Sequence, residues 1–230
     1  MVIGDGLVAR SFKHYEKLDE FLIFASGVSH SKSCTEVDFN RERALLTSSL
    51  QAHASRNFVY FGTTSVADPD LGDSPYVRHK LAMEELIRKE ARLYHIFRLS
   101  NLAGRSVNPN TVLNFFYNHI VNGIPFQLWK HSERNIIDVE DAFLVIDHIL
   151  KDRSFSNQVI NIANEQNYPV PYIVRCIEHF TGRRADFIET GKGEKFQTDL
   201  SAVLPLYKKL KIGFGDSYLP RILEKYYTKK

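Results

Sequence analysis

The 230-residue sequence has few of the features that stabilise a chain lacking a large hydrophobic core. It has two cysteines, Cys34 and Cys176, which lie far apart without a CxxC pair or a neighbouring histidine pair. We therefore expect no metal site and no disulfide, but two reduced thiols in a reducing cytosol. With 43% hydrophobic residues, the composition is that of an ordinary globular protein. A chain of this length buries about 70% of its unfolded surface and needs no covalent cross-link.

Long apolar runs and a strong charge excess are also missing. No segment approaches the ~20 apolar residues that a membrane-spanning helix needs, and the N-terminus reaches Gly4 without the basic start of a signal peptide. Thirty basic and 27 acidic residues leave a net charge of +3, too small and too scattered to indicate nucleic acid or an anionic membrane as a partner. We expect a cytoplasmic protein with neither kind of partner.

Short apolar runs alternate with longer segments of helical periodicity, a pattern typical of parallel βα units. The sequence has no internal repeat and no low-complexity linker, so its mixed C-terminal 45 or so residues are expected to pack onto the body. Strands are predicted at 1–3, 21–25, 58–61, 94–99, 135–139 and 159–163, and helices at 7–15, 37–55, 76–92, 111–122, 141–150 and 172–181, with an apolar stretch at 126–129.

A glycine turn joins the first predicted strand to the first predicted helix. Gly4-Asp5-Gly6-Leu7-Val8-Ala9 fits the pattern GxGxxA. The first glycine permits a tight turn, the second lets the backbone approach a pyrophosphate, and the small third residue lets the helix pack close to the strand. Glycine turns at such junctions also occur for purely structural reasons. The position at the start of a βα pattern favours dinucleotide binding.

Tyr76 and Lys80 form a YxxxK pair, one helical turn apart on a predicted helix. A nearby ammonium lowers the pKa of a phenol and makes it an acid or base for proton transfer. Alone, the pair is more typical of a helix-start tyrosine with a solvated lysine. The hydroxyl cluster Thr63-Thr64-Ser65 upstream favours chemistry, because a hydroxyl there can polarise a substrate carbonyl while Tyr76 moves the proton. His79 shows no pairing in the sequence, so a solvated or core role is expected for it.

Taken in order, these motifs resemble the extended short-chain dehydrogenase/reductases, the NAD-dependent epimerase/dehydratase family that modifies nucleotide-linked sugars. The resemblance spans almost the whole chain, and the joint order is more specific than any single motif. The similar segments are 4–9, 25–27, 62–66, the YxxxK of 76–80, 98–104, 134–141 and 161–163.

The resemblance implies an α/β fold, with a Rossmann-type parallel sheet covered by helices on both faces and a small C-terminal substrate lobe. The Rossmann-type body is expected to comprise residues 1–104 and 135–165, and the lobe residues 105–134 and 166–230.

The family's functional residues carry over to matching positions of this chain. Tyr76 is implied as the catalytic acid or base, Lys80 as the residue that lowers its pKa and holds the nicotinamide ribose, and Thr63 as the hydroxyl that binds the reacting sugar oxygen. Asp138 and Asp141 are expected to cap the following helix. The implied cofactor is NAD or NADP, contacted by Gly4, Gly6, Leu7, Val8, Ala25, Ser26, Tyr76 and Lys80, and the implied substrate contacts are Thr64, Asn101 and the diphosphate-binding Arg134.

The sequence departs from the family pattern after the glycine turn. About a dozen residues separate this turn from the strand at Phe21, where the family fits two further βα units. The acidic residue that holds the adenosine ribose has no counterpart, because Asp19 and Glu20 precede the wrong strand. The fold is thus expected to be truncated after its first βα unit. Three consequences stay open: weaker and less selective binding of the cofactor, completion of the site by a partner subunit, and loss of the cofactor.

A second departure narrows the chemistry. The family's 4,6-dehydratases have Thr-Asp-Glu where this chain has Thr63-Thr64-Ser65, so elimination of water lacks its acid and base. The sequence therefore favours 4-keto reduction or epimerisation of a nucleotide-linked sugar in surface polysaccharide biosynthesis. The alternative is a non-catalytic nucleotide-sugar-binding or regulatory protein. The helices at 38–54 and 76–92 resemble those of the family's dimer interface and predict a homodimer, although they equally suit the role of covering the sheet.

Overall fold

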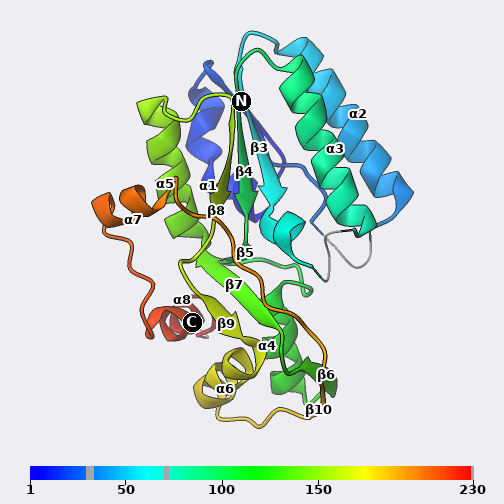
Figure 1. Ribbon diagram of the computed structural model, residues 1–230, viewed down its shortest axis with the longest axis vertical. Coiled ribbons are helices and arrows are strands. Elements are labelled where there is room, and N and C mark those ends of the chain that lie inside the picture. The colour runs from blue at the N-terminus through cyan, green and yellow to red at the C-terminus, as the bar shows by residue number, and fades with distance from the viewer. Residues whose placement is uncertain (30–33, 70–72, 229–230) are drawn as a thin grey trace.

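In the computed structural model, which describes residues 1–29, 34–69 and 73–228, five parallel strands form the central sheet (Figure 1). Their order is β1-β2-β3-β4-β8. Each strand is a short apolar run bounded by turn residues, which is typical of a sheet buried on both faces. The strands are β1 (Val2–Ile3), β2 (Phe21–Phe24), β3 (Asn57–Thr63), β4 (Tyr94–Leu99) and β8 (Gln158–Ile162).

Helices cover both faces of this sheet (Figure 1). On one face, α2 (Glu36–Ala52) and α3 (Pro75–Glu90) pack onto Leu22 and Phe24 of β2. On the other face, α1 (Leu7–Ser11) and α5 (Val139–Asp152) pack against the core that contains Ile23. Alternate strand residues thus face opposite cores, as the two-residue period of a strand requires. The predicted α/β class with helices on both faces is confirmed.

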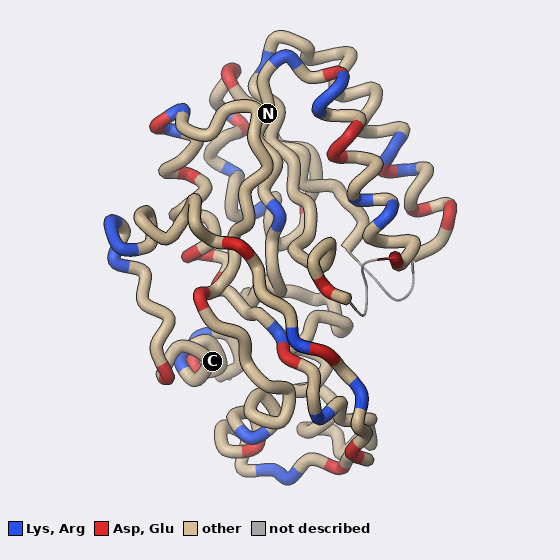
Figure 2. Tube along the Cα trace, viewed as in Figure 1, with Lys and Arg blue, Asp and Glu red and all other residues tan. Residues whose placement is uncertain are grey.

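The surfaces of α2 and α3 carry basic and acidic residues interspersed (Figure 2). Their buried faces carry Leu46, Leu50, Met83 and Ile87, which lie against the sheet. The helices therefore do cover the sheet, and the homodimer stays a prediction. No helix within the described residues is both long and apolar enough to span a bilayer.

The predicted truncation is visible in the sheet. The chain leaves β1 through α1 and a 3-10 turn, η1 (Lys13–Lys17), and then enters β2, which is the strand paired with β1. Strand β1 is therefore at the edge of the sheet as described. The predicted single helix over 7–15 is divided at Phe12, where both its ring and that of Tyr15 become buried.

A second lobe lies beyond the carboxyl ends of the strands (Figure 1). It contains a small sheet in which β7 pairs with both β5 and β9, and a strand pair, β6 and β10. We expected β7 in the Rossmann-type body, but it belongs to this second sheet. In the central sheet, the strand beside β4 is β8. Residues 229–230 of the predicted lobe lie outside the described residues. The remaining elements are β5 (Asn101–Ala103), α4 (Val112–Asn122), β6 (Phe126–Trp129), β7 (Glu133–Asp138), β9 (Asn167–Pro169), α6 (Val170–Thr181), β10 (Phe187–Thr190), α7 (Leu204–Lys209) and α8 (Tyr218–Tyr227).

The C-terminal helix α8 is fastened to the start of α5. Asp138 caps α5 by accepting a hydrogen bond from the Glu140 N–H at 2.9 Å, as predicted. It also accepts from Lys225 Nζ at 2.7 Å and Tyr226 OH at 2.6 Å, both on α8. Asp141 lies in the first turn of α5 and accepts from Tyr218 OH at 2.7 Å. Asp138 thus both caps α5 and attaches α8, whereas Asp141, also expected as a cap, lies inside the helix and only attaches α8.

Candidate active site

The carboxyl ends of the first four strands form one edge of the central sheet. The register aligns Ile3 with Phe24 at the ends of β1 and β2, and Thr63 with Leu99 at the ends of β3 and β4. Gly4, Ala25 and Ser100 directly follow β1, β2 and β4. Thr63 is the last residue of β3. In open parallel sheets, ligands bind outside this edge. The fold therefore brings most of the predicted cofactor and catalytic residues to one place.

The glycine turn has the geometry of a phosphate-binding loop. Gly4 has a φ of +121°, and a Cβ there would lie 2.5 Å from the Ala25 carbonyl oxygen, so the turn requires glycine. Gly6 is the N-cap of α1, and no side chain caps this helix. A Cβ on Gly6 would meet nothing within 4 Å. Open space thus lies beside Gly6 at the start of α1, which fits the pyrophosphate of a dinucleotide.

Thr63 and Tyr76 are brought together at the same edge. Helix α3 begins at Pro75, after Ser74, whose hydroxyl accepts from the Val77 N–H at 3.3 Å. This cap places Tyr76 in the first turn, where Thr63 is close enough to influence the pKa of the phenol. Burial raises the pKa of Tyr76 to about 12, and Thr63 opposes this rise. The pair can donate a proton and hold an oxygen next to it.

Lys80 does not act on Tyr76 as the sequence predicted. Its ammonium donates to Glu42 Oε1 and to the Tyr60 hydroxyl, each at 3.1 Å. The pKa of Tyr76 is raised, not lowered, because burial dominates and the positive charge of Lys80 is compensated by Glu42. The expectation that Lys80 lowers the phenol pKa is therefore wrong for this ligand-free structure. Its cofactor contact stays a prediction.

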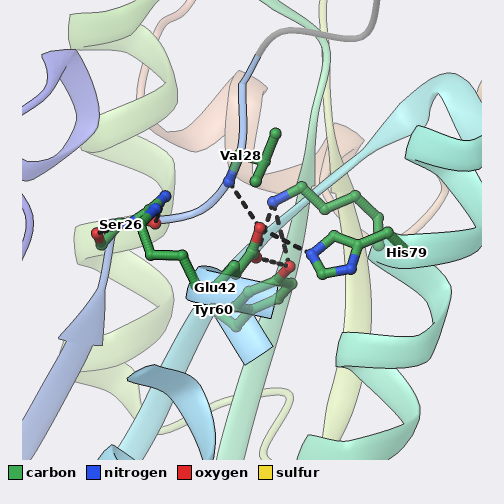
Figure 3. A network of polar contacts seen from close by, with 7 residues as sticks. Ser26, Val28, Glu42, Tyr60 and His79 are labelled. Atoms are coloured by element: carbon green, nitrogen blue, oxygen red, sulfur yellow. Dashed lines mark hydrogen bonds and ion pairs between the residues drawn. The ribbon is translucent and has the colours of Figure 1, made fainter. Parts of the chain in front are cut away.

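Glu42, at the centre of this cluster, was not identified from the sequence. The side chain is completely buried, and its neighbours come from a loop, a strand and a second helix (Figure 3). Although burial raises its pKa, the His79 hydrogen bond, the Lys80 charge and the bonds from Tyr60 and Val28 together lower it to about 2. Glu42 is therefore ionised at neutral pH. A single glutamate on an amphipathic helix gives no signal of this role in a sequence.

His79 also differs from the prediction that it is unpaired. Its Nε2 lies 3.0 Å from Glu42 Oε2, and its ring stacks on Phe39 with 4.5 Å between the ring centroids. The histidine is buried, with 6% of its surface exposed. Of the two expected roles, solvated or core, the structure shows the core role. In that core, His79 is paired with Glu42.

The predicted substrate residues lie mainly on the second sheet. Asn101 of β5 and Arg134 of β7 are on neighbouring strands, since Asn101 is in register with Ile136. The Asn101 amide donates to the Asn135 carbonyl at 2.8 Å. Arg134 donates to Ser132 Oγ at 2.6 Å and to the Glu133 carbonyl at 2.7 Å. Asn101 is therefore bonded to the neighbouring strand β7, whereas Arg134 is bonded to residues of its own segment.

Two other predicted residues are placed by local contacts. Thr64 is buried at the start of the 3-10 turn η2 (Thr64–Ala67), directly after Thr63. Ser26 follows β2 and accepts from Arg41 Nη1 through its side chain at 3.2 Å and from Nη2 through its carbonyl at 3.1 Å. Both residues are at the carboxyl edge, as a role in the site requires.

Ser100 is a further polar residue at this edge that the sequence did not indicate. It follows β4 directly, and its hydroxyl is buried with no hydrogen-bond partner among the described residues. Because buried polar groups are almost always paired, this hydroxyl fits a site that receives a polar ligand group. A serine between two motif residues has no periodicity or spacing that could reveal this.

Two surface cavities of the described residues lie away from the Thr63–Tyr76 pair. A cavity of about 240 Å³ lies between α6 and α8 and is lined by Tyr172 and Cys176. Another, of about 360 Å³, lies between α1 and α5 and is lined by Leu7 and Glu140. Neither is lined by the Thr63–Tyr76 pair or by Lys80. The site is therefore assigned from strand ends and side-chain chemistry rather than from a cavity.

The parallel sheet, the glycine turn and the tyrosine helix define a Rossmann-type protein of the short-chain dehydrogenase/reductase kind. The chain belongs to the NAD-dependent epimerase/dehydratase family, whose model matches residues 4–163. The expected family is thereby confirmed, and NAD or NADP is the cofactor expected of this family. The glycine turn before α1 fits the pyrophosphate part of that cofactor, whereas the adenosine part has no counterpart among the described strands.

Solved structures share the fold over almost the whole chain. UDP-glucuronic acid 4-epimerase from Bacillus cereus, in complex with UDP-glucuronic acid and NAD, has a TM-score of 0.74 and 17% identity, covering 94% of this chain and 76% of its own. UDP-N-acetylglucosamine 4-epimerase from Methanobrevibacter ruminantium M1 has a TM-score of 0.69 and 16% identity, covering 90% and 76%. RMD from Pseudomonas aeruginosa, complexed with NADPH, has a TM-score of 0.74 and 14% identity, and the match covers 97% of this chain and 96% of RMD. No curated protein matches the sequence.

Proposed function

We propose that this protein is an NAD(P)-dependent enzyme that reduces a 4-keto group of a nucleotide-linked sugar or epimerises the sugar at that carbon. The observation that carries the proposal is the neighbouring Thr63–Tyr76 pair, which lies at the carboxyl edge of the sheet together with the Gly4–Gly6 turn. Family membership and the structural likeness to UDP-sugar epimerases support it. By the same analogy, the pathway is surface polysaccharide biosynthesis and the protein acts as a cytoplasmic homodimer.

The residues of the site divide the work by their chemistry. When bound, the nicotinamide supplies or accepts the hydride at the sugar carbon. Tyr76, whose pKa is raised to about 12, is protonated at neutral pH and donates its proton to the keto oxygen during reduction. Thr63 holds that oxygen by a hydrogen bond. The N–H groups of Leu7 and Val8 bind the cofactor pyrophosphate, and Arg134 binds the sugar diphosphate through its guanidinium.

Epimerisation places a further demand on Tyr76. The sugar hydroxyl must first lose a proton to the phenolate, and the same phenol must later return a proton. Reduction requires only the protonated phenol, which is the form found here. Both reactions remain within the proposal, and the missing Asp and Glu after Thr63 disfavour dehydration.

One observation favours a second function, that of a nucleotide-sugar-binding protein without dinucleotide chemistry. Strand β1 has only two residues and lies at the sheet edge as described, where an adenosine site needs further strands. A protein of this kind uses Asn101 and Arg134 to bind the sugar nucleotide and leaves Tyr76 without a reaction. The two functions differ in their dependence on a dinucleotide.

The test is an activity assay with a panel of UDP-linked sugars and UDP-linked 4-keto sugars. Consumption of NADH or NADPH is followed by absorbance, and exchange of epimers by NMR. We expect turnover that falls by about a hundredfold or more in Tyr76→Phe, because the proton donor is lost. Tyr94→Phe is the matched control, since Tyr94 begins β4 at the opposite edge of the sheet. Equal activity of both variants and the wild type contradicts the proposed role of Tyr76.

A further inference from the structure

The carboxylate of Glu42 is a fully occupied acceptor. Its Oε1 accepts from Tyr60 OH at 2.6 Å and from Lys80 Nζ at 3.1 Å. Its Oε2 accepts from the Val28 N–H at 2.6 Å and lies 3.0 Å from His79 Nε2 (Figure 3). An ionised carboxylate has about four lone-pair sites, so every site has a partner. Such a carboxylate is a fixed negative charge.

The ammonium of Lys80, by contrast, is not fully occupied. An ammonium has three N–H donors, and the described contacts use two of them, to Glu42 and to Tyr60. The Tyr60 hydroxyl can accept from Lys80 because it donates its own proton to Glu42. Lys80 is only 2% exposed, so water does not readily satisfy the third donor. A buried donor without a partner favours a ligand that brings an oxygen acceptor.

Gly27, which has no side chain, lies directly against this ammonium. A Cβ on Gly27 would lie 2.5 Å from Lys80 Nζ and 3.1 Å from Glu42 Oε1. Gly27 belongs to the segment after β2, which also contains the predicted cofactor residues Ala25 and Ser26. Glu42 is bonded to Val28 in the same segment. The Glu42 carboxylate therefore connects the segment after β2, which contains predicted cofactor residues, to Lys80 on α3.

We propose that Glu42 is a positioning residue that keeps the Lys80 ammonium charged and fixed, with one N–H left to bind a ribose hydroxyl of the dinucleotide. The identity of that ligand rests on the proposed function, whereas the effect of Glu42 on Lys80 does not. Glu42 acts through Lys80, since it touches no reacting atom. Its four protein partners leave it no acceptor site for a ligand.

Other charged groups near Lys80 do not replace Glu42. Burial lowers the pKa of Lys80, and the groups that oppose this are Glu42 of α2, Glu84 of α3 and Cys34 before α2. Glu84 is already paired with Arg98, at 2.7 and 2.9 Å. Tyr60 contacts Lys80 through a neutral hydroxyl, and burial raises its pKa well above the ordinary value. Glu42 is thus the carboxylate whose removal leaves Lys80 buried without a counter-charge.

The first measurement is an NMR titration of lysine side chains in the ligand-free protein, with the Lys80 signal assigned by its loss in Lys80→Met. In Glu42→Gln, we expect the pKa of Lys80 to fall by about two pH units, because the burial that disfavours the charged form is no longer opposed. Glu84→Gln is the matched control, since it removes another buried carboxylate of the same region. A Lys80 pKa unchanged by Glu42→Gln overturns the proposal.

A milder variant keeps the test decisive if Glu42→Gln does not fold. Glu42→Asp keeps the charge but withdraws the carboxylate from Lys80 by about one bond length. We expect an intermediate fall of the Lys80 pKa, of about one pH unit. The same pKa as in the wild type, in a folded Glu42→Asp protein, argues equally against Glu42 as the group that holds Lys80.

The second measurement is calorimetric binding of NADH and NADPH at about pH 6.5 and pH 8.5. Between these two pH values, the affinity of the wild type and of Glu84→Gln for whichever dinucleotide binds is expected to change by less than about twofold. Glu42→Gln is expected to lose about tenfold at the higher pH relative to the lower, because its lowered Lys80 pKa leaves a larger neutral fraction there. A pH-independent affinity in Glu42→Gln contradicts the positioning role. If the wild type binds neither dinucleotide, the proposed function fails, while the NMR titration still decides what Glu42 does to Lys80.

Discussion

Removing the charge of Glu42 is expected to lower the free energy of unfolding by about 3 kcal/mol at neutral pH. The pKa of this carboxyl is about 2 in the folded protein, against 4.5 without the fold. Each pKa unit corresponds to about 1.36 kcal/mol of differential stabilisation, so the difference of about 2.5 units gives the value above. Because the folded pKa is the lower one, this stabilisation is present above about pH 4.5 and is lost as the pH falls toward about 2.

The assay is urea unfolding of the wild type, Glu42→Gln and Glu84→Gln at several pH values between about 3 and 7. The stability gap between the wild type and Glu42→Gln should be largest near neutral pH and should narrow below about pH 4.5, since the carboxyl of the unfolded state then takes up a proton while the folded Glu42 stays charged. The slopes of the unfolding free energy against urea concentration should agree between the proteins. Differences between the unfolding midpoints then report differences in stability. A gap below about 1 kcal/mol at neutral pH, or one that does not narrow in acid, refutes the argument.

Two further predictions concern the glycine turn and the C-terminal helix. Gly4→Ala should destabilise the protein by at least about 2 kcal/mol in a thermal melt, because its φ of +121° and the 2.5 Å approach of a Cβ to the Ala25 carbonyl both exclude a side chain; an unchanged melting temperature contradicts this. Asp138→Ala should cost about 2 kcal/mol by removing the α5 cap and the bonds from Lys225 and Tyr226. Hydrogen exchange should then rise selectively in α8, and uniform exchange across the protein contradicts the attachment.

The strands of the central sheet were predictable because each is a continuous apolar run between turn residues. Predicted and observed ends differ by one or two residues in most of them, as for Phe21–Phe24 and Gln158–Ile162, and they coincide for Tyr94–Leu99. Strand β10, Phe187–Thr190, was missed because its residues are mostly exposed and its pairing with β6 depends on tertiary structure. Local periodicity does not contain that information.

The candidate site was predictable only where it consists of motifs. Gly4, Thr63 and Tyr76 follow from spacing along the chain, and the fold brings them to one edge of the sheet. Glu42 could not be found in this way, since its partners Tyr60, His79 and Lys80 are 18, 37 and 38 residues away. Its role depends on how α2 packs beside α3, and the raised pKa of Tyr76 follows from the same packing.

The central claim is that the shortened fold still binds a dinucleotide, and titration calorimetry with NAD, NADH, NADP and NADPH tests it most directly. Gly6→Ser provides the probe, because serine is a good N-cap and its side chain enters the open space before α1. Gly215→Ser is the matched control, at a glycine whose Cβ also meets nothing within 4 Å. The account predicts micromolar binding of at least one dinucleotide by the wild type and the control, weakened at least tenfold in Gly6→Ser. Binding of a UDP-sugar without any dinucleotide contradicts it and identifies a sugar-nucleotide-binding protein instead.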